Sequence, residues 1–168
     1  MSSQSLVIGV IAAVLLFWAV GAYNRLVSLR NELLRCFAPL DEQIRARHAL
    51  LLRWADTLRE AEPQALDALH AASLQVETAC THARGRPASA SALTSLRLAE
   101  EILAQARARL QPLPGDEALV ATLSEGDTTL AFARRQFNDA ALAYNRAVSM
   151  FPTWVLAGLF GFRKAGTL

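Results

Sequence analysis

Residues 116–151 read DEALVATLSEGDTTLAFARRQFNDAALAYNRAVSMF, and this stretch decides the fold. Apolar or small residues recur in it at steps of three and four, which is the spacing of a helix that buries one face. They are Leu119, Leu123, Gly126, Leu130, Ala133, Phe137, Ala140, Tyr144, Val148 and Phe151. Pro152 follows, and a residue that precedes proline disfavours helical backbone. The pattern therefore predicts one long helix that ends at Phe151.

A second long stripe begins near the N-terminus and has the same spacing. Its members are Leu26, Leu29, Leu33, Phe37, Leu40, Ile44, Leu51, Trp54 and Leu58, with Arg47 at the one skipped position. Pro39 lies inside this stripe and is expected to kink the helix, because proline removes a donor and crowds the carbonyl of Arg35.

Two shorter stripes lie between the long ones. They comprise Leu66, Leu69, Ser73, Val76 and Cys80, then Leu96, Ala99, Leu103, Ala106 and Leu110, with a turn at Arg84-Gly85-Arg86-Pro87 between them. If Pro63 and Pro112–Gly115 break the helices, four helices run out and back twice; if they only kink them, two very long helices result. Since no window alternates as a strand does, the sequence predicts an all-α antiparallel bundle over residues 24–151.

An uncharged run precedes the bundle. Residues 6–22 read LVIGVIAAVLLFWAVGA, which is near the lower length limit for a helix that crosses a bilayer. The span includes Leu6, Val7, Ile8, Phe17, Trp18 and Ala22. A cleaved signal peptide that ends at Val20-Gly21-Ala22 is the alternative, but the basic residues that begin such a signal are missing. We therefore predict a retained, single-pass transmembrane helix over residues 1–23.

Arginines flank this run on one side only. Arg25, Arg30 and Arg35 follow it, whereas no lysine or arginine precedes it. The positive-inside rule then places the bulk of the chain in the cytoplasm. Because the N-terminal flank is so short, the periplasmic or extracellular side stays as the alternative.

One heptapeptide pattern occurs twice, as YNRLVSL at 23–29 and YNRAVSM at 144–150. Helices over Asn24–Ala61 and Asp116–Phe151 would each be roughly 55 Å long, at about 1.5 Å per residue. Matched lengths would bring both copies to one height beside the bilayer, with the tyrosines in the interfacial belt and the asparagines bonded across the helix pair. This predicts a neck of Tyr23, Asn24, Arg25, Tyr144, Asn145 and Arg146; chance repetition is the alternative.

The tail, residues 152–168, is apolar at its start and basic further on. From Phe151 to Phe162 it has only apolar residues, glycine, Pro152 and Thr153, too few to cross a hydrocarbon core of about 30 Å. The candidate interface residues are Trp154, Phe160, Phe162, Arg163 and Lys164, whose cations suit anionic lipid. The segment either lies shallowly in the membrane surface or folds as a lid on the base of the bundle.

No pattern of a catalytic, cofactor or metal site emerges. The chain has no glycine-rich phosphate loop, no His-Glu-x-x-His and no nucleophile elbow, so no small-molecule substrate is evident. The histidines, His48, His70 and His82, lie far apart in the sequence.

Two of the adjacent acidic pairs are Glu100-Glu101 and Asp116-Glu117, and the side chains of such a pair diverge on a helix. Glu100-Glu101 is expected on the solvated surface and Asp116-Glu117 at a helix N-terminus. Cys36 and Cys80 match no metal or redox spacing and are expected to be buried free thiols.

Three segments resemble the LemA family of bacterial membrane proteins: YNRLVSLRNELL, Leu-Asp-x-Gln-Ile, and ARRQFNDAALAYNRAVSMFPTWVLAGLFGF. The resemblance covers Tyr23 to about Leu58 and Ala118 to Phe162. Cys36-Phe37 departs from the family's usual small residue and tryptophan, and Arg53 from a nearby proline. The resemblance implies one N-terminal membrane anchor, a coiled-coil-like helical domain and a bacterial inner-membrane location. It implies no enzymatic activity and so supplies no catalytic residues.

Two classes of function remain. The first is a non-enzymatic, membrane-tethered scaffold that binds an unknown protein or a second copy of itself. The second is a membrane-surface effector whose tail contacts lipid or a neighbouring membrane protein. The lipid bilayer is a partner in both. Nucleic acid is not expected as a partner, because the net charge is only +2 and the basic residues do not interleave with aromatics.

Overall fold

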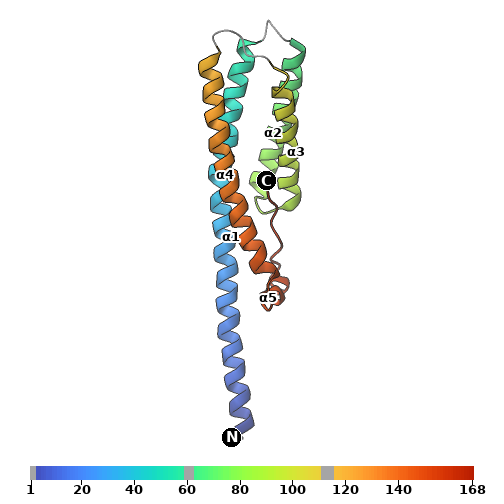
Figure 1. The fold of residues 1–168 in the computed structure, drawn as a ribbon. Coiled ribbons are helices and arrows are strands. Elements are labelled where there is room, and N and C mark those ends of the chain that lie inside the picture. Colours follow the sequence, from blue (N-terminus) through green and yellow to red (C-terminus); the bar gives the residue numbers. More distant parts are fainter. Residues whose placement is uncertain (1–2, 59–62, 111–115) are drawn as a thin grey trace.

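The computed structural model describes residues 3–58, 63–110 and 116–168, and its elements there are all helices (Figure 1). They are α1 (Ser3–Thr57), α2 (Pro63–Gly85), α3 (Ala90–Arg107), α4 (Glu117–Ser149) and α5 (Thr153–Leu159). The chain runs out along α1, back along α2, out along α3 and back along α4. The predicted all-α antiparallel bundle is confirmed.

The alternative of two very long helices is wrong. α1 ends at Thr57, and α2 begins at Pro63. Proline suits the first position of a helix, because an N–H group there would have no acceptor within the helix. Pro112–Gly115 lie outside the described residues. α3 ends at Arg107 and α4 begins at Glu117, so a second break also occurs in that part of the chain.

α1 packs mainly on α4, and α2 mainly on α3. The two long stripes face each other in the first pair, and midway along it the rings of Phe37 and Phe137 meet edge to face with centroids 5.9 Å apart. The two shorter stripes are buried throughout. The apolar spacing in the sequence therefore identified the core correctly, because only one face of each helix is withdrawn from water.

α1 continues through Pro39 as one helix, with Phe37, Leu40 and Ile44 buried around the missing hydrogen bond, and the kink at Pro39 stays a prediction. One detail at a proline differs from expectation. α4 ends at Ser149 rather than at Phe151, because Met150 already has extended backbone (ψ 135°). Phe151 is consequently not in the core; its side chain is 77 % exposed.

Charged side chains line the seam between the α1–α4 pair and the α2–α3 pair. Arg84 donates two hydrogen bonds to Asp41, of 3.1 and 3.0 Å, and Arg107 lies 2.6 Å from Asp127. Arg47 pairs with Glu100, and the nearest atoms of Arg47 and Asp127 are 3.5 Å apart. The pairs Arg84–Asp41, Arg107–Asp127 and Arg47–Glu100 link the two helix pairs across the seam, whereas Arg47–Asp127 lies within the α1–α4 pair.

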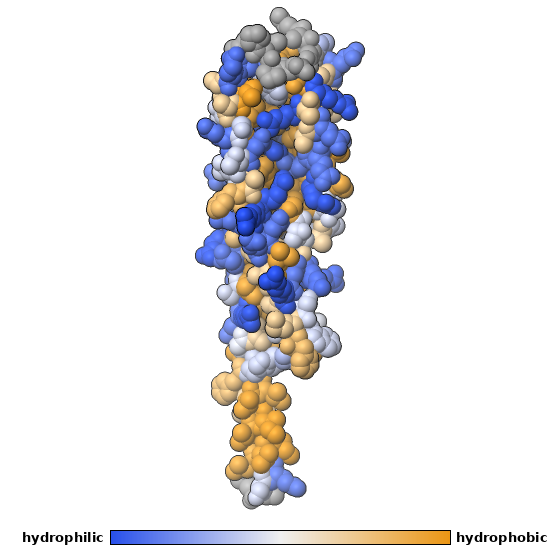
Figure 2. All heavy atoms as spheres, viewed as in Figure 1, coloured by the Kyte–Doolittle hydropathy of each residue, from blue (hydrophilic) through white to orange (hydrophobic). Residues whose placement is uncertain are grey.

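The first part of α1 has no helix packed against it. Within the described residues, α1 is the one helix long and apolar enough to cross a membrane, and no residue of its most apolar window is buried. Leu6, Val7, Ile8 and Phe17 are exposed by more than half, Trp18 by 38 %, and Ala22 is half-buried. Figure 2 shows this part as an apolar rod that extends from a largely polar bundle. The N-terminal part of α1 is thus a candidate membrane span.

Candidate functional site

The base of the bundle, where the exposed part of α1 meets α5, gathers the residues that the sequence singled out (Figure 1). α5 packs against both α1 and α4. The ring of Tyr23 lies 4.9 Å from that of Phe160 and 5.9 Å from that of Phe162, measured between centroids. Tyr23 therefore joins the end of the candidate membrane span to the C-terminal tail.

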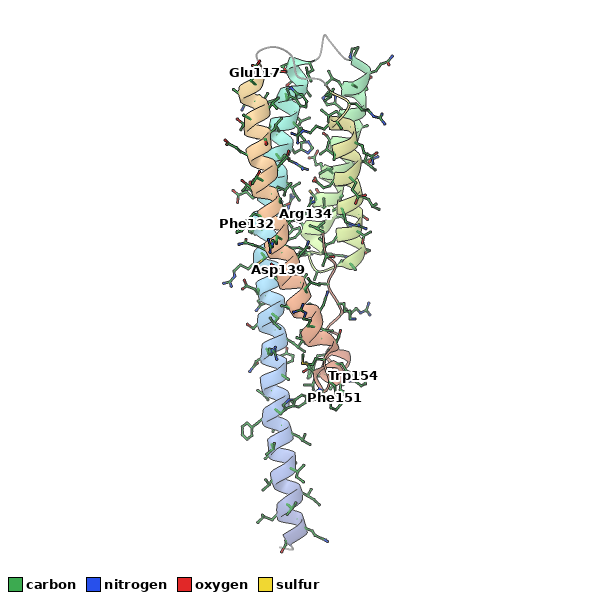
Figure 3. All side chains as sticks on the ribbon, viewed as in Figure 1. Glu117, Phe132, Arg134, Asp139, Phe151 and Trp154 are labelled. Carbon is green, nitrogen blue, oxygen red and sulfur yellow. The ribbon has the colours of Figure 1, made fainter. Side chains whose placement is uncertain are left out.

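Large apolar side chains remain exposed around α5, and we call them the collar. They are Met150, Phe151, Trp154, Val155, Leu159 and Phe160, each exposed by more than half. Figure 3 shows Phe151 and Trp154 at the base, beside α5. Within α5, Ala157 is the buried residue. Large apolar side chains exposed together in this way are typical of a membrane or protein contact.

The chain reverses direction directly after α5. Gly161 has φ +73°, a left-handed conformation that glycine adopts without strain, and Phe162 donates its N–H to the Ala157 carbonyl at 2.8 Å. This helix-ending motif directs the following residues back along the bundle. The side chain of Phe162 packs partly buried against the core.

The last six residues, 163–168, form an extended segment that we call the strap. The Asn145 side chain donates to the Ala165 carbonyl at 2.9 Å and accepts from the Ala165 N–H at 2.7 Å. Two turns away on α4, Asn138 donates to the main-chain oxygen of Leu168 at 2.6 Å and accepts from its N–H at 2.8 Å. Seven residues of helix and three of extended chain each measure about 10 Å, so the two spacings match.

The strap also touches the first turn of α3. A Cβ added to Gly166 would lie 2.8 Å from the Cα of Ala90 and 3.1 Å from the Cβ of Leu93. Ala165 is buried, whereas Arg163 and Lys164 are exposed. The strap thus connects α4 with the α2–α3 pair through its main chain and its smallest side chains.

The two copies of the heptapeptide do not lie side by side, so the predicted neck is wrong in its register. The pairs Phe37–Phe137 and Arg47–Asp127 set a register in which Tyr144 lies opposite Arg30. Two turns of helix, about 10 Å, separate that level from Tyr23. The equal-length argument failed because it brings Asn24 level with Phe151, the far end of the second helix, whereas Tyr144 lies seven residues, or two turns, before Phe151.

The individual neck residues have different environments. Tyr144 is buried in the bundle and not exposed to water in the interfacial region. Burial raises the pKa of its hydroxyl, and the opposing effect of the Arg30 charge is smaller. Asn24, Arg25 and Arg146 are exposed. Asn145 bonds the strap and not Asn24. Both copies nevertheless contact the tail, one through Tyr23 and the other through Asn145.

The choice between a lid and a segment in the membrane surface stays a prediction. The strap folds onto the bundle, while Trp154 of α5 and Phe160 just after it are exposed by 54 % and 55 %. Sequence reasoning missed Asn138, Ala165, Gly166 and Leu168. The spacing of Asn138 and Asn145 was the available signal, since residues seven apart share one face of a helix.

Of the two predictions about acidic residues, the one for Glu100 is corrected and the one for Asp116-Glu117 is confirmed. Glu100 is buried, with 6 % of its side chain exposed, because it faces the seam, whereas its neighbour Glu101 points outward. Asp116 does stand at the start of α4, but its side chain makes no capping bond. It is buried and accepts a 3.0 Å hydrogen bond from the Trp54 indole.

The thiols differ from each other. Cys80 is buried, and burial, followed by the charges of Glu100 and Asp41, raises its pKa from an ordinary 9.0 to about 12. Cys36 is only half-buried, contrary to expectation, and burial and Glu32 raise its pKa. In the described parts of the chain, no three histidine, cysteine or acidic side chains converge as metal ligands would.

A cavity of about 560 Å³ opens along the seam between α1, α3 and α4. Its walls include Leu51, Trp54, Leu103 and Leu123, and its charged lining consists of Arg47, Arg107, Asp127 and Arg134. The Nε groups of Arg47 and Arg134 are buried without a hydrogen-bond acceptor. These charged side chains form ion pairs between the helices.

Comparison with known proteins identifies one relationship. The sequence model of the LemA family matches residues 62–168, which include α2 to α5 and the strap. Neither a curated protein nor a solved structure matches the chain.

Proposed function

The chain belongs to the LemA family, and on that premise we propose that it is a non-enzymatic helical scaffold anchored in a bacterial inner membrane. The observation that carries this proposal is the division of α1 within a single helix. Its first third is exposed and apolar, and the rest forms one side of a packed core. Such a helix holds the bundle at a bilayer surface.

We infer that α1 crosses the membrane once and that the bundle lies in the cytoplasm. Arg25, Arg30 and Arg35 follow the apolar segment, and all three support this orientation by the positive-inside rule. Arg163 and Lys164 are exposed near the same end of the bundle, where anionic lipid would attract them.

A protein partner, or a second copy of the chain, would bind the bundle in this proposal. The outer face of α2 and α3 supports such binding, since Leu74, Leu98 and Ile102 are exposed there around a shallow groove. Exposed apolar side chains grouped in this way are common at protein interfaces.

A second candidate function is a membrane-surface effector, and the collar favours it. Trp154 and Phe160 would lie at headgroup depth, and α5 would rest in the membrane surface beside the transmembrane helix. The docked strap favours the scaffold instead, because it holds the C-terminal residues on the bundle.

Photo-crosslinking in intact membranes tests the two candidates. A photoreactive residue at Ile102 should form a discrete adduct with a protein, and one at Trp154 should form adducts with lipid if the effector proposal holds. Glu125, exposed on α4, is the control position. The same adducts at Glu125 as at Ile102, or none at Ile102, would contradict the scaffold. Protein adducts alone at Trp154 would contradict the effector.

A further inference from the structure

We propose that the surface formed by Asn138 and Asn145 of α4 and the first turn of α3 is a peptide-binding site, and that the strap is its resident, detachable ligand. The site recognises an extended main chain that carries small residues at two adjacent positions. Neither the anchor nor the scaffold proposal depends on this inference.

The first step is recognition of the main chain. Asn138 and Asn145 each satisfy the N–H and the main-chain oxygen of one strap residue, as a neighbouring β-strand would. A carboxamide is the side chain suited to this task, because it has a donor and an acceptor side by side. These four hydrogen bonds depend on no side chain of the strap, so they select extended backbone rather than sequence.

The second step is steric selection. Ala165, the residue that Asn145 binds, is buried, and Gly166 beside it faces the backbone of Ala90 at a distance that no Cβ tolerates. Leu168 packs partly buried against the core at the far end. The site therefore accepts the pattern small, glycine, any residue, apolar, which Ala165-Gly166-Thr167-Leu168 fulfils.

The third step is detachment. The strap belongs to no helix, and its other side chains, Arg163, Lys164 and Thr167, are exposed. Asn138 and Asn145, which bind the strap, belong to α4. The apolar face of α4 packs in the core of the bundle and does not need the strap to be buried. Segments with few buried apolar groups open locally before the core unfolds. Detachment would separate the first turn of α3 from α4 at this end of the seam.

Hydrogen exchange in the full chain, in bilayer discs, tests the proposal. The N–H groups of Ala165 and Leu168 should exchange more slowly than that of Thr167 but faster than that of Phe137 in the core of α4. Asn145→Asp keeps the acceptor and removes the donor, so it should speed exchange at Ala165 by about tenfold, the usual weight of one hydrogen bond. Asn24→Asp, the same change at the exposed asparagine of the other heptapeptide copy, should change it less than about twofold.

A synthetic peptide of the sequence KAGTL tests binding in trans and does not rely on a variant that folds. In millimolar excess it should displace the strap and raise tryptic cleavage after Lys164, whereas KAVTL should not, because valine cannot occupy the position of Gly166. Equal effects of the two peptides, or no effect of either, would overturn the proposal. Exchange of Ala165 at the same rate as Phe137 would also overturn it, because the strap would then leave only on global unfolding.

Discussion

At the scale of single residues, position on a helix decides what a side chain does. Phe132 and Phe137 are both on α4 and only five residues apart. Phe132 is 63 % exposed, whereas Phe137 is fully buried against Phe37. Figure 3 shows Phe132 on the outer side of α4. The two residues therefore form a matched pair for measuring what the core contributes.

Phe137→Ala should lower the free energy of unfolding by about 3–5 kcal/mol, because it leaves a cavity at the centre of the α1–α4 pair. Phe132→Ala should change it by less than about 0.5 kcal/mol. Denaturation followed by circular dichroism of the full chain in detergent measures both. Similar losses for the two variants would show that α4 is not packed on α1 by this face.

The Cys80 thiol should make stability depend on pH at the alkaline end. Its pKa is raised by burial to about 12 in the folded chain, whereas the ordinary value is 9.0. Between these values the unfolded chain ionises the thiol and the folded chain does not, so stability falls as pH rises from about 9 to 12. Denaturation at a series of pH values should show this slope, and Cys80→Ala should reduce it. An unchanged slope would exclude Cys80 as its source.

At the scale of elements, polar contacts join two helix pairs that each have an apolar interface of their own. α3 illustrates this with adjacent residues. Glu100 faces the seam and pairs with Arg47 and Arg134, while Glu101 faces solvent and lies 3.8 Å from Arg97. Because Glu100 is buried and Arg47 is largely so, loss of either charge leaves the other less well compensated.

Glu100→Gln should destabilise the bundle by about 3 kcal/mol, since it removes the one buried carboxylate that Arg47 and Arg134 share. Glu101→Gln should cost less than about 1 kcal/mol, as is usual for exposed ion pairs. Chemical denaturation of the two variants beside the parent chain gives both values. If Glu101→Gln costs as much as Glu100→Gln, the seam does not depend on the buried pair.

At the scale of the whole molecule, the register between α1 and α4 decides which residues meet at the base. Arg30, and not Tyr23, lies opposite Tyr144, and the same register places Leu33 opposite Ala141. Both of these residues are buried. The base is consequently closed by the tail, which contacts Tyr23 through Phe160 and Asn145 through Ala165.

Cysteines at positions 33 and 141, in a chain without Cys36 and Cys80, should be joined by a short crosslinker within one molecule. Cysteines at positions 24 and 145 should not, because two turns of helix separate their levels. Electrophoresis after mild denaturation distinguishes the two outcomes. Preferential crosslinking of the 24–145 pair would restore the side-by-side neck.

Helix type, core faces and the candidate membrane span were predictable from the sequence alone. Each depends on local spacing: steps of three and four assign a face to a helix, and an uncharged apolar run identifies a segment that water does not solvate well. This is why Phe37 and Phe137 were assigned to the core correctly, and why the exposed part of α1 was located.

Only the tertiary structure decided at which level along α1 each residue of α4 lies, and which polar side chains pair with each other. A helical period specifies a face but not how far one helix slides along another, so the level of Tyr144 against α1 was not predictable from spacing. The choice between Glu100 and Glu101, and the pairing of Asn145 with the strap, depend on atoms far apart in the sequence. Hydrogen bonds and ion pairs need matched positions in three dimensions, whereas burial of apolar surface needs only the right face.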